Sequence, residues 1–96
     1  MTLEEIKAKI SGNKKLLEEK YNIKSIGIFG SCVNDTLSKK SDIDILVEFS
    51  KIPDIFEFIK LEDFLTTLLG AKVDLVTKKA LKPFIKETIL NETVYI

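Results

Sequence analysis

The sequence predicts a small α/β (α+β) protein whose elements follow the order α-β-β-α-β-α-β. Residues 23–29 and 42–49 are rich in β-branched side chains and alternate in part between apolar and polar, as strands do. Residues 2–20 and 54–69 instead repeat their apolar side chains at helical spacing. A length of 96 residues suits one domain, so we expect residues 1–96 to form a single domain.

The first helix is predicted over about residues 2–20. Thr2 and Glu5 have the spacing of a capping box, in which each side chain accepts a hydrogen bond from the other residue's backbone N–H. Apolar side chains then recur at about helical intervals. Residues 11–13, Ser-Gly-Asn, are weak helix formers, so the middle of this helix is expected to be imperfect.

Two strands and a long connection follow. Within the predicted strand 23–29, Ile26 and Ile28 are two residues apart and therefore point to the same face. Residues 30–41 are mostly small and polar, and a loop of that length in a compact domain is often functional. Residues 42–49 have the clearest strand pattern in the chain.

The second helix is predicted over residues 54–69. Asp54 and Glu57 have N-cap spacing, and Gly70 suits the position after the last turn. The predicted apolar face of this helix consists of Ile55, Phe58, Leu61, Leu65 and Leu68.

The last three elements are short. Residues 72–76 alternate like a strand. Pro83 suits the first turn of a third helix that runs to about residue 91. Residues 94–96 are predicted to form a final edge strand.

The composition excludes several kinds of chemistry. The chain contains no His and no Arg, which rules out a Ser-His-Asp triad, a zinc site with His ligands and a guanidinium clamp on phosphate. Cys32 is the single cysteine, so no internal disulfide forms. The 15 basic residues, all Lys, balance 15 acidic residues, which argues against direct nucleic-acid binding. Because there is no signal peptide and no apolar run long enough for a membrane span, we expect a cytoplasmic protein that binds no membrane.

Two carboxylates lie at the start of the clearest strand. Asp42 and Asp44 are separated by one residue, so their side chains project from one face, about 6.6 Å apart along the strand. Like charges on one face repel, and a divalent cation between them removes that repulsion. Mg²⁺ prefers such hard oxygen ligands, usually one or two carboxylates together with substrate phosphates. The alternative is a pair of aspartates at a solvated strand end.

Two further features become meaningful beside this pair. Gly30 and Ser31 end a strand and open the long loop, where backbone and hydroxyl groups could approach a phosphate, although taken alone these two residues are better explained by an ordinary turn. Asp74 alternates with the apolar residues of the strand 72–76. If that strand lies beside residues 42–49, Asp74 joins the pair, and three carboxylates can hold two Mg²⁺ ions for attack on a phosphoryl centre.

Taken together, these residues resemble the nucleotidyltransferase superfamily. The motif is Gly-Ser, a spacer and Ser-Asp-x-Asp, and it appears as Gly30-Ser31 followed, after residues 32–40, by Ser41-Asp42-Ile43-Asp44. More closely, nearly the whole chain is similar to minimal nucleotidyltransferases of the MNT type, which are antitoxins of HEPN-domain toxins. The resemblance implies a nucleotidyltransferase-like fold, namely a small mixed β-sheet with helices packed on it.

The resemblance also implies an activity and its residues. Gly30 and Ser31 would bind the nucleoside triphosphate, while Asp42, Asp44 and Asp74 would be the catalytic, metal-binding residues. The enzyme would use Mg²⁺, with two ions, to transfer a nucleoside monophosphate, AMP from ATP, to a hydroxyl. The acceptor would be a tyrosine of a partner HEPN toxin, and the transfer would silence that toxin.

One departure from the family pattern motivates a second hypothesis. Asn34 and Asp35 stand where family members commonly have Arg and Gly, so the loop has one cation fewer and one acid more. Lys39 or Lys40 could replace that cation, or both could simply be solvated. The alternative function is therefore a catalytically impaired binding module that neutralises a toxin by complex formation.

A third reading is a small α/β domain with an acidic surface patch and no nucleotide site. The sequence leaves open whether the chain forms homo-oligomers.

Overall fold

The structure is a computed structural model that describes residues 2–30 and 42–96. Its strands form one four-stranded sheet in the order β3-β2-β1-β4. These strands are β1 (Ile23–Phe29), β2 (Ile43–Phe49), β3 (Val73–Thr77) and β4 (Val94–Tyr95). Because β1 is antiparallel to both β2 and β4 whereas β3 is parallel to β2, the sheet is mixed, as the resemblance to nucleotidyltransferases implies.

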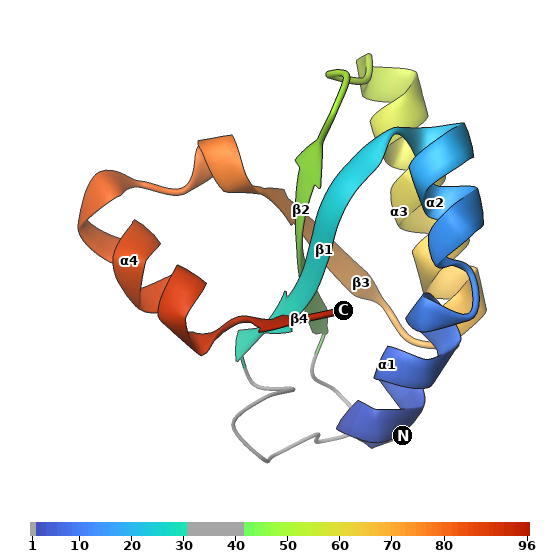
Figure 1. The fold of residues 1–96 in the computed structure, drawn as a ribbon, viewed down its shortest axis with the longest axis horizontal. Coiled ribbons are helices and arrows are strands. Elements are labelled where there is room, and N and C mark those ends of the chain that lie inside the picture. Colours follow the sequence, from blue (N-terminus) through green and yellow to red (C-terminus); the bar gives the residue numbers. More distant parts are fainter. Residues whose placement is uncertain (1, 31–41) are drawn as a thin grey trace.

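The helices are divided between the two sides of the sheet. They are α1 (Leu3–Ser11), α2 (Lys14–Tyr21), α3 (Ile55–Leu69), the short 3₁₀ helix η2 (Lys78–Ala80) and α4 (Pro83–Glu92). Figure 1 shows α1, α2 and α3 together on one side, whereas η2 and α4 lie on the other side. Among these described helices, none is long and apolar enough to cross a membrane.

The N-terminal helical segment differs from its prediction. The capping box is present, since the Glu5 N–H donates to the Thr2 hydroxyl at 3.1 Å. The prediction of one helix over residues 2–20 is wrong, because α1 and α2 are separate helices. Their separation nevertheless lies within residues 11–13, where the sequence predicts an imperfect middle. The break follows Gly12, where the Asn13 side-chain amide donates to the Lys9 carbonyl at 2.9 Å and so satisfies one end of α1.

The helix α3 agrees with its predicted bounds but not with all of its predicted apolar face. The Glu57 N–H donates to the Asp54 carboxylate at 2.8 Å, and Gly70 ends the helix with a left-handed backbone at φ 68°. Leu61 and Leu65 are buried in the core as expected. Ile55 is 64% exposed, since it lies on the rim of a groove at the end of the helix rather than over the sheet.

The core lies between the sheet and the helices α1, α2 and α3. Alternate residues of β2, namely Ile43, Ile45 and Val47, are buried there. Ile26 and Ile28 of β1 join them, as their shared face predicts. Because strand side chains alternate, the residues between them point to the opposite face, the side on which α4 lies (Figure 1).

Candidate active site

Two of the predicted site residues stand side by side on the face of the sheet opposite the core. Asp44 of β2 and Asp74 of β3 are paired across the parallel ladder in the same register position. Their neighbours Ile43 and Val73 are buried on the core face, so both carboxylates point away from the core. The condition set by the sequence, that β3 lies beside β2, is therefore met.

Gly30 brings a third segment to these carboxylates. It directly follows β1, in which Phe29 is paired with Asp44. Its φ of 74° lies in the left-handed region that favours glycine. A Cβ atom added to Gly30 would collide with the Oδ2 atom of Asp44. The glycine is therefore required here for two separate reasons, the backbone conformation and the close approach to a carboxylate.

Asp42 lies one residue before β2, next to Lys72. The Ile43 N–H donates to the Lys72 carbonyl at 2.9 Å, which fixes the two chain segments together at the start of the parallel ladder. The Lys72 Nζ atom lies 3.9 Å from the Oδ2 atom of Asp42. This pair is solvated, with side chains 79% and 43% exposed respectively, so it contributes little to folding stability.

The charges of Asp42 and Asp74 act on the carboxyl group of Asp44. Partial burial raises the pKa of the Asp44 carboxyl above its usual value, and the nearby charges of Asp74 and Asp42 raise it further. All three causes penalise the ionised form of Asp44. A bound cation would remove this penalty, which makes the position attractive for a metal ion.

The carboxylates suit Mg²⁺, which commonly takes only part of its coordination shell from protein side chains. Carboxylate oxygens are hard ligands, and Mg²⁺ is typically held by one or two of them while substrate phosphates and water complete its shell. Within residues 2–30 and 42–96, no three His, Cys, Asp or Glu side chains are already gathered around a common metal position. Joint ligation by Asp42, Asp44 and Asp74 therefore stays a prediction.

Other predicted residues lie outside the described part of the chain. They are Ser31, whose hydroxyl is predicted to bind phosphate, and Asn34, Asp35, Lys39 and Lys40, which include the departures from the family motif. The position of Lys72 beside Asp42 was missed by sequence reasoning. The sequence does show that Lys72 directly precedes the strand that carries Asp74. This position places Lys72 near Asp42 only if β2 and β3 are parallel, which the sequence alone does not establish.

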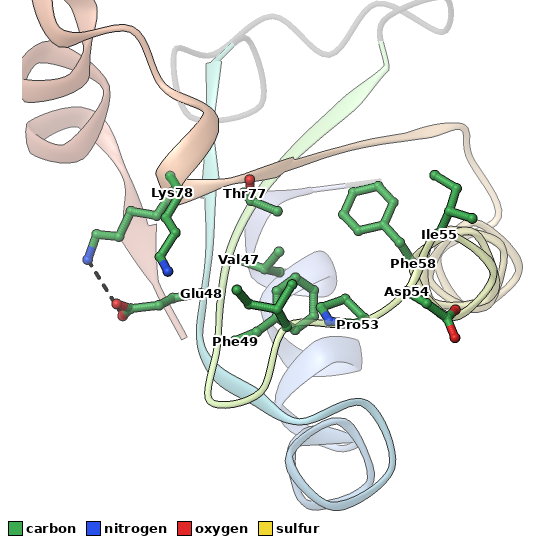
Figure 2. Close-up of a pocket in the computed structure, with 11 residues that line it drawn as sticks. Val47, Glu48, Phe49, Pro53, Asp54, Ile55, Phe58, Thr77 and Lys78 are labelled. Atoms are coloured by element: carbon green, nitrogen blue, oxygen red, sulfur yellow. Dashed lines mark ion pairs between the residues drawn. The ribbon is translucent and has the colours of Figure 1, made fainter.

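A groove of about 530 Å³ lies at the other ends of β2 and β3. Figure 2 shows its wall of Val47, Phe49 and Phe58, with the ion pair between Glu48 and Lys78 on one side. None of the three aspartates lines this groove. The acidic site and the apolar groove are therefore separate features.

Comparison with known proteins gives a consistent result. Residues 10–96 match the family model of the nucleotidyltransferase domain. The chain is 47% identical over 96 residues to the protein adenylyltransferase MntA of Thermococcus cleftensis, covering 100% of this chain and 97% of that protein.

Solved structures agree in fold. One, described provisionally as a minimal nucleotidyltransferase, has a TM-score of 0.84 and 29% identity, and the match covers 98% of this chain and 95% of that one. Another is a toxin–antitoxin structure with AMP-PNP, at a TM-score of 0.73 and 27% identity, covering 92% of this chain and 69% of that one.

Proposed function

This chain belongs to the nucleotidyltransferase domain family, and from that premise we propose that it is a Mg²⁺-dependent protein adenylyltransferase. It transfers AMP from ATP to a tyrosine hydroxyl of a partner toxin of the HEPN type and so acts as an antitoxin. The observation that carries the proposal is the in-register pair of Asp44 and Asp74, with Gly30 against Asp44.

Each residue of the site has a role in this reaction. Gly30 leaves room for the phosphate chain beside Asp44, and Ser31 contributes a hydroxyl and an N–H to a phosphate oxygen. Asp42, Asp44 and Asp74 would hold Mg²⁺, which would offset negative charge on the carboxylates and on the phosphates. Asp74 also accepts the proton of the attacking hydroxyl.

The reaction needs positioning more than acid–base chemistry. The tyrosine oxygen forms a bond to the α-phosphorus, the bond from that phosphorus to the bridging oxygen breaks, and pyrophosphate leaves. Because Asp44 and Asp74 are carried on adjacent strands, their carboxylates are held by the sheet backbone. A site of this kind requires neither His nor Arg, which the chain lacks.

Relatives support the nucleotide and the partner. The relative from Thermococcus cleftensis is named for adenylyl transfer to protein, and one structural neighbour contains AMP-PNP in a toxin–antitoxin assembly. The choice of a HEPN toxin and of tyrosine follows from the resemblance to MNT antitoxins. We place the reaction in the cytoplasm, where ATP and Mg²⁺ are both supplied.

The test is adenylyl transfer from ATP to a purified HEPN toxin, followed by mass spectrometry of the toxin. The wild-type chain with Mg²⁺ should add adenylyl groups to a tyrosine, and Asp44→Asn should add none. Asp63→Asn is the matched control, since Asp63 is an exposed acid of α3 away from the site. Transfer by Asp44→Asn at the wild-type rate would contradict the proposed site.

The alternative function, neutralisation by binding alone, is separated by a protection assay. A variant in which Asp42, Asp44 and Asp74 are all changed to Asn should fail to protect cells from the toxin if transfer is the mechanism. If this folded variant protects as well as wild type, complex formation is sufficient, and the enzymatic mechanism is not what neutralises the toxin.

A further inference from the structure

The candidate site needs a positive charge that the sequence motif does not supply. The site has three aspartates, and in the proposed reaction a bound triphosphate adds further negative charge. The chain has no Arg, and the usual Arg position of the loop is Asn34. The sequence suggested Lys39 or Lys40 as the replacement, but both lie outside the described residues.

Lys72 is held at the acidic site by its backbone. Its carbonyl accepts the hydrogen bond from the Ile43 N–H at 2.9 Å, and the next residue, Val73, donates its N–H to the Thr66 hydroxyl at 3.3 Å. The Cα position of Lys72 is therefore fixed by β2 on one side and by α3 on the other. A long side chain that starts from a fixed point next to Asp42 has a limited range of positions for its charge.

The side chain itself is free to change partners. Its ammonium lies 3.9 Å from the Asp42 carboxylate, beyond ordinary hydrogen-bond length, and the side chain is 79% exposed. An exposed pair of this kind is weak, so an incoming anion can displace it at little cost. Of the ion pairs found among the described residues, this is the one that involves a site aspartate.

Lys78 provides a contrast on the neighbouring segment. Its Nζ atom lies 3.8 Å from Glu48, and it stands over the ring of Tyr95 at 5.8 Å from the centroid. It follows β3, whereas Lys72 precedes it, so the two lysines lie at opposite ends of that strand. Lys78 thus lies away from the site with its side chain only 31% exposed, whereas Lys72 lies beside Asp42 with its side chain 79% exposed.

We propose that Lys72 is the cation that binds the phosphate chain of the nucleoside triphosphate. Without a ligand, its ammonium partly neutralises Asp42. With nucleotide and Mg²⁺ present, Asp42 would be one of the residues that hold the ion, and the Lys72 ammonium would move to a phosphate oxygen. A lysine suits this exchange because its compact charge needs no fixed bidentate geometry. The inference rests on the proposed function, since it concerns the same nucleotide.

Two affinities separate this role from a structural one, because Lys72→Gln should move them in opposite directions. The variant should bind AMP-PNP in the presence of Mg²⁺ about tenfold more weakly, since a charge-assisted contact is lost. It should bind Mg²⁺ alone more tightly than wild type, because the competing ammonium beside Asp42 is gone. Both affinities are measured by isothermal titration calorimetry on the full chain.

The controls test charge and position. Lys72→Arg keeps the charge and should restore AMP-PNP affinity to near the wild-type value. Lys79→Gln removes an exposed lysine that lines the distant groove and should change neither affinity. AMP, with a single phosphate, should lose less affinity than AMP-PNP on Lys72→Gln.

Three results would overturn the inference. The first is unchanged AMP-PNP affinity in Lys72→Gln, and the second is an equal loss with Lys79→Gln. The third is weaker binding of both Mg²⁺ and AMP-PNP together with a lower Tm, which would indicate structural damage at the start of β3. If the wild-type chain itself binds no AMP-PNP with Mg²⁺, the proposed function fails as well, so the two failures are distinguishable.

Discussion

Gly30→Ala should disable the site by a mechanism that a second glycine of the chain can isolate. Gly30 and Gly70 have nearly the same φ angle, 74° and 68°, both in the left-handed region. Their surroundings differ, because a Cβ atom at position 30 collides with Asp44 whereas one at position 70 meets nothing within 4 Å. Gly70→Ala is therefore a control that has the backbone strain without the collision.

The magnitude follows from these two terms. Alanine in the left-handed region costs about 1–2 kcal/mol, which applies to both variants. For a domain of this size, a loss of 1 kcal/mol lowers Tm by roughly 4–8 °C, so each variant should melt about 4–16 °C below wild type. Only Gly30→Ala must also displace the Asp44 carboxylate or the end of β1, and this change acts on the site.

The assays are thermal melts by circular dichroism, calorimetric binding of AMP-PNP with Mg²⁺, and adenylyl transfer below both melting temperatures. We expect both variants to be less stable, but only Gly30→Ala to lose nucleotide binding and transfer. The reasoning is refuted if Gly30→Ala keeps wild-type transfer, because the site would then tolerate a methyl group at position 30 against the Asp44 carboxylate. Equal loss of transfer in Gly70→Ala would show that strain alone accounts for the effect.

Further predictions concern charge and packing. Because the pKa of Asp44 is raised, protons compete with a metal ion for its carboxylate at higher pH than they would at an ordinary aspartate. Calorimetry should therefore show that the affinity for Mg²⁺ falls as the pH decreases through this raised pKa. The raised pKa also means that ionised Asp44 lowers folding stability at pH values above this pKa, and that the penalty disappears as the pH falls through the pKa. Asp44→Asn should therefore raise the unfolding free energy of the metal-free protein near neutral pH, measured by urea titration. An unchanged or lower unfolding free energy would contradict the effect of the neighbouring charges on Asp44. Thr2→Ala removes the capping hydroxyl of α1 and should cost about 1 kcal/mol in the same titrations, whereas no loss would mean that the cap is inactive in solution. Leu65→Ala should cost about 2–5 kcal/mol because this side chain is fully buried, and a loss well below that range would indicate that the core can collapse around the missing atoms.

The local features of the fold could be predicted from the sequence because their causes are local. The capping box of α1 and the left-handed glycine after α3 each depend on residues within one helical turn. The faces of β2 follow from alternation, which correctly assigned Asp44 to the side opposite Ile43 and Ile45. The residues that determine these features lie within a few positions of one another, so the sequence alone is enough to predict them.

Features that depend on distant segments were predicted less well. The weak helix formers at residues 11–13 indicated an imperfect middle, but not that α1 and α2 would be separate helices that each turn toward the core, where Ile10 and Leu17 are both fully buried. Ile55 is exposed because it is the first residue of α3 and lines the groove rather than the core. Helical spacing identifies an apolar face, but it does not indicate how far along the helix that face is covered.

The pairing of the aspartates lies between these two cases. Alternation places Asp44 and Asp74 on given faces of their strands, but it does not determine which residues are opposite each other. A shift by two residues would keep every side chain on its face and still separate the carboxylates. The sequence could therefore state only the condition that β3 lies beside β2, and the register Asp44 to Asp74 came from the structure.

This register explains how a small domain can contain an unfavourable cluster of charge. Paired carboxylates repel each other, and partial burial increases the penalty on Asp44, so the acidic end of the sheet destabilises the ligand-free chain. The opposite face of the same strands is apolar and buried, with Ile43, Ile45 and Leu75 in the core, and this packing holds β2 and β3 in register despite the repulsion. A cation that binds the carboxylates removes a penalty that the fold already contains, which favours binding without any rearrangement of the strands. The packing of the core face is thus what keeps Asp44 and Asp74 side by side, as the proposed metal and nucleotide site requires.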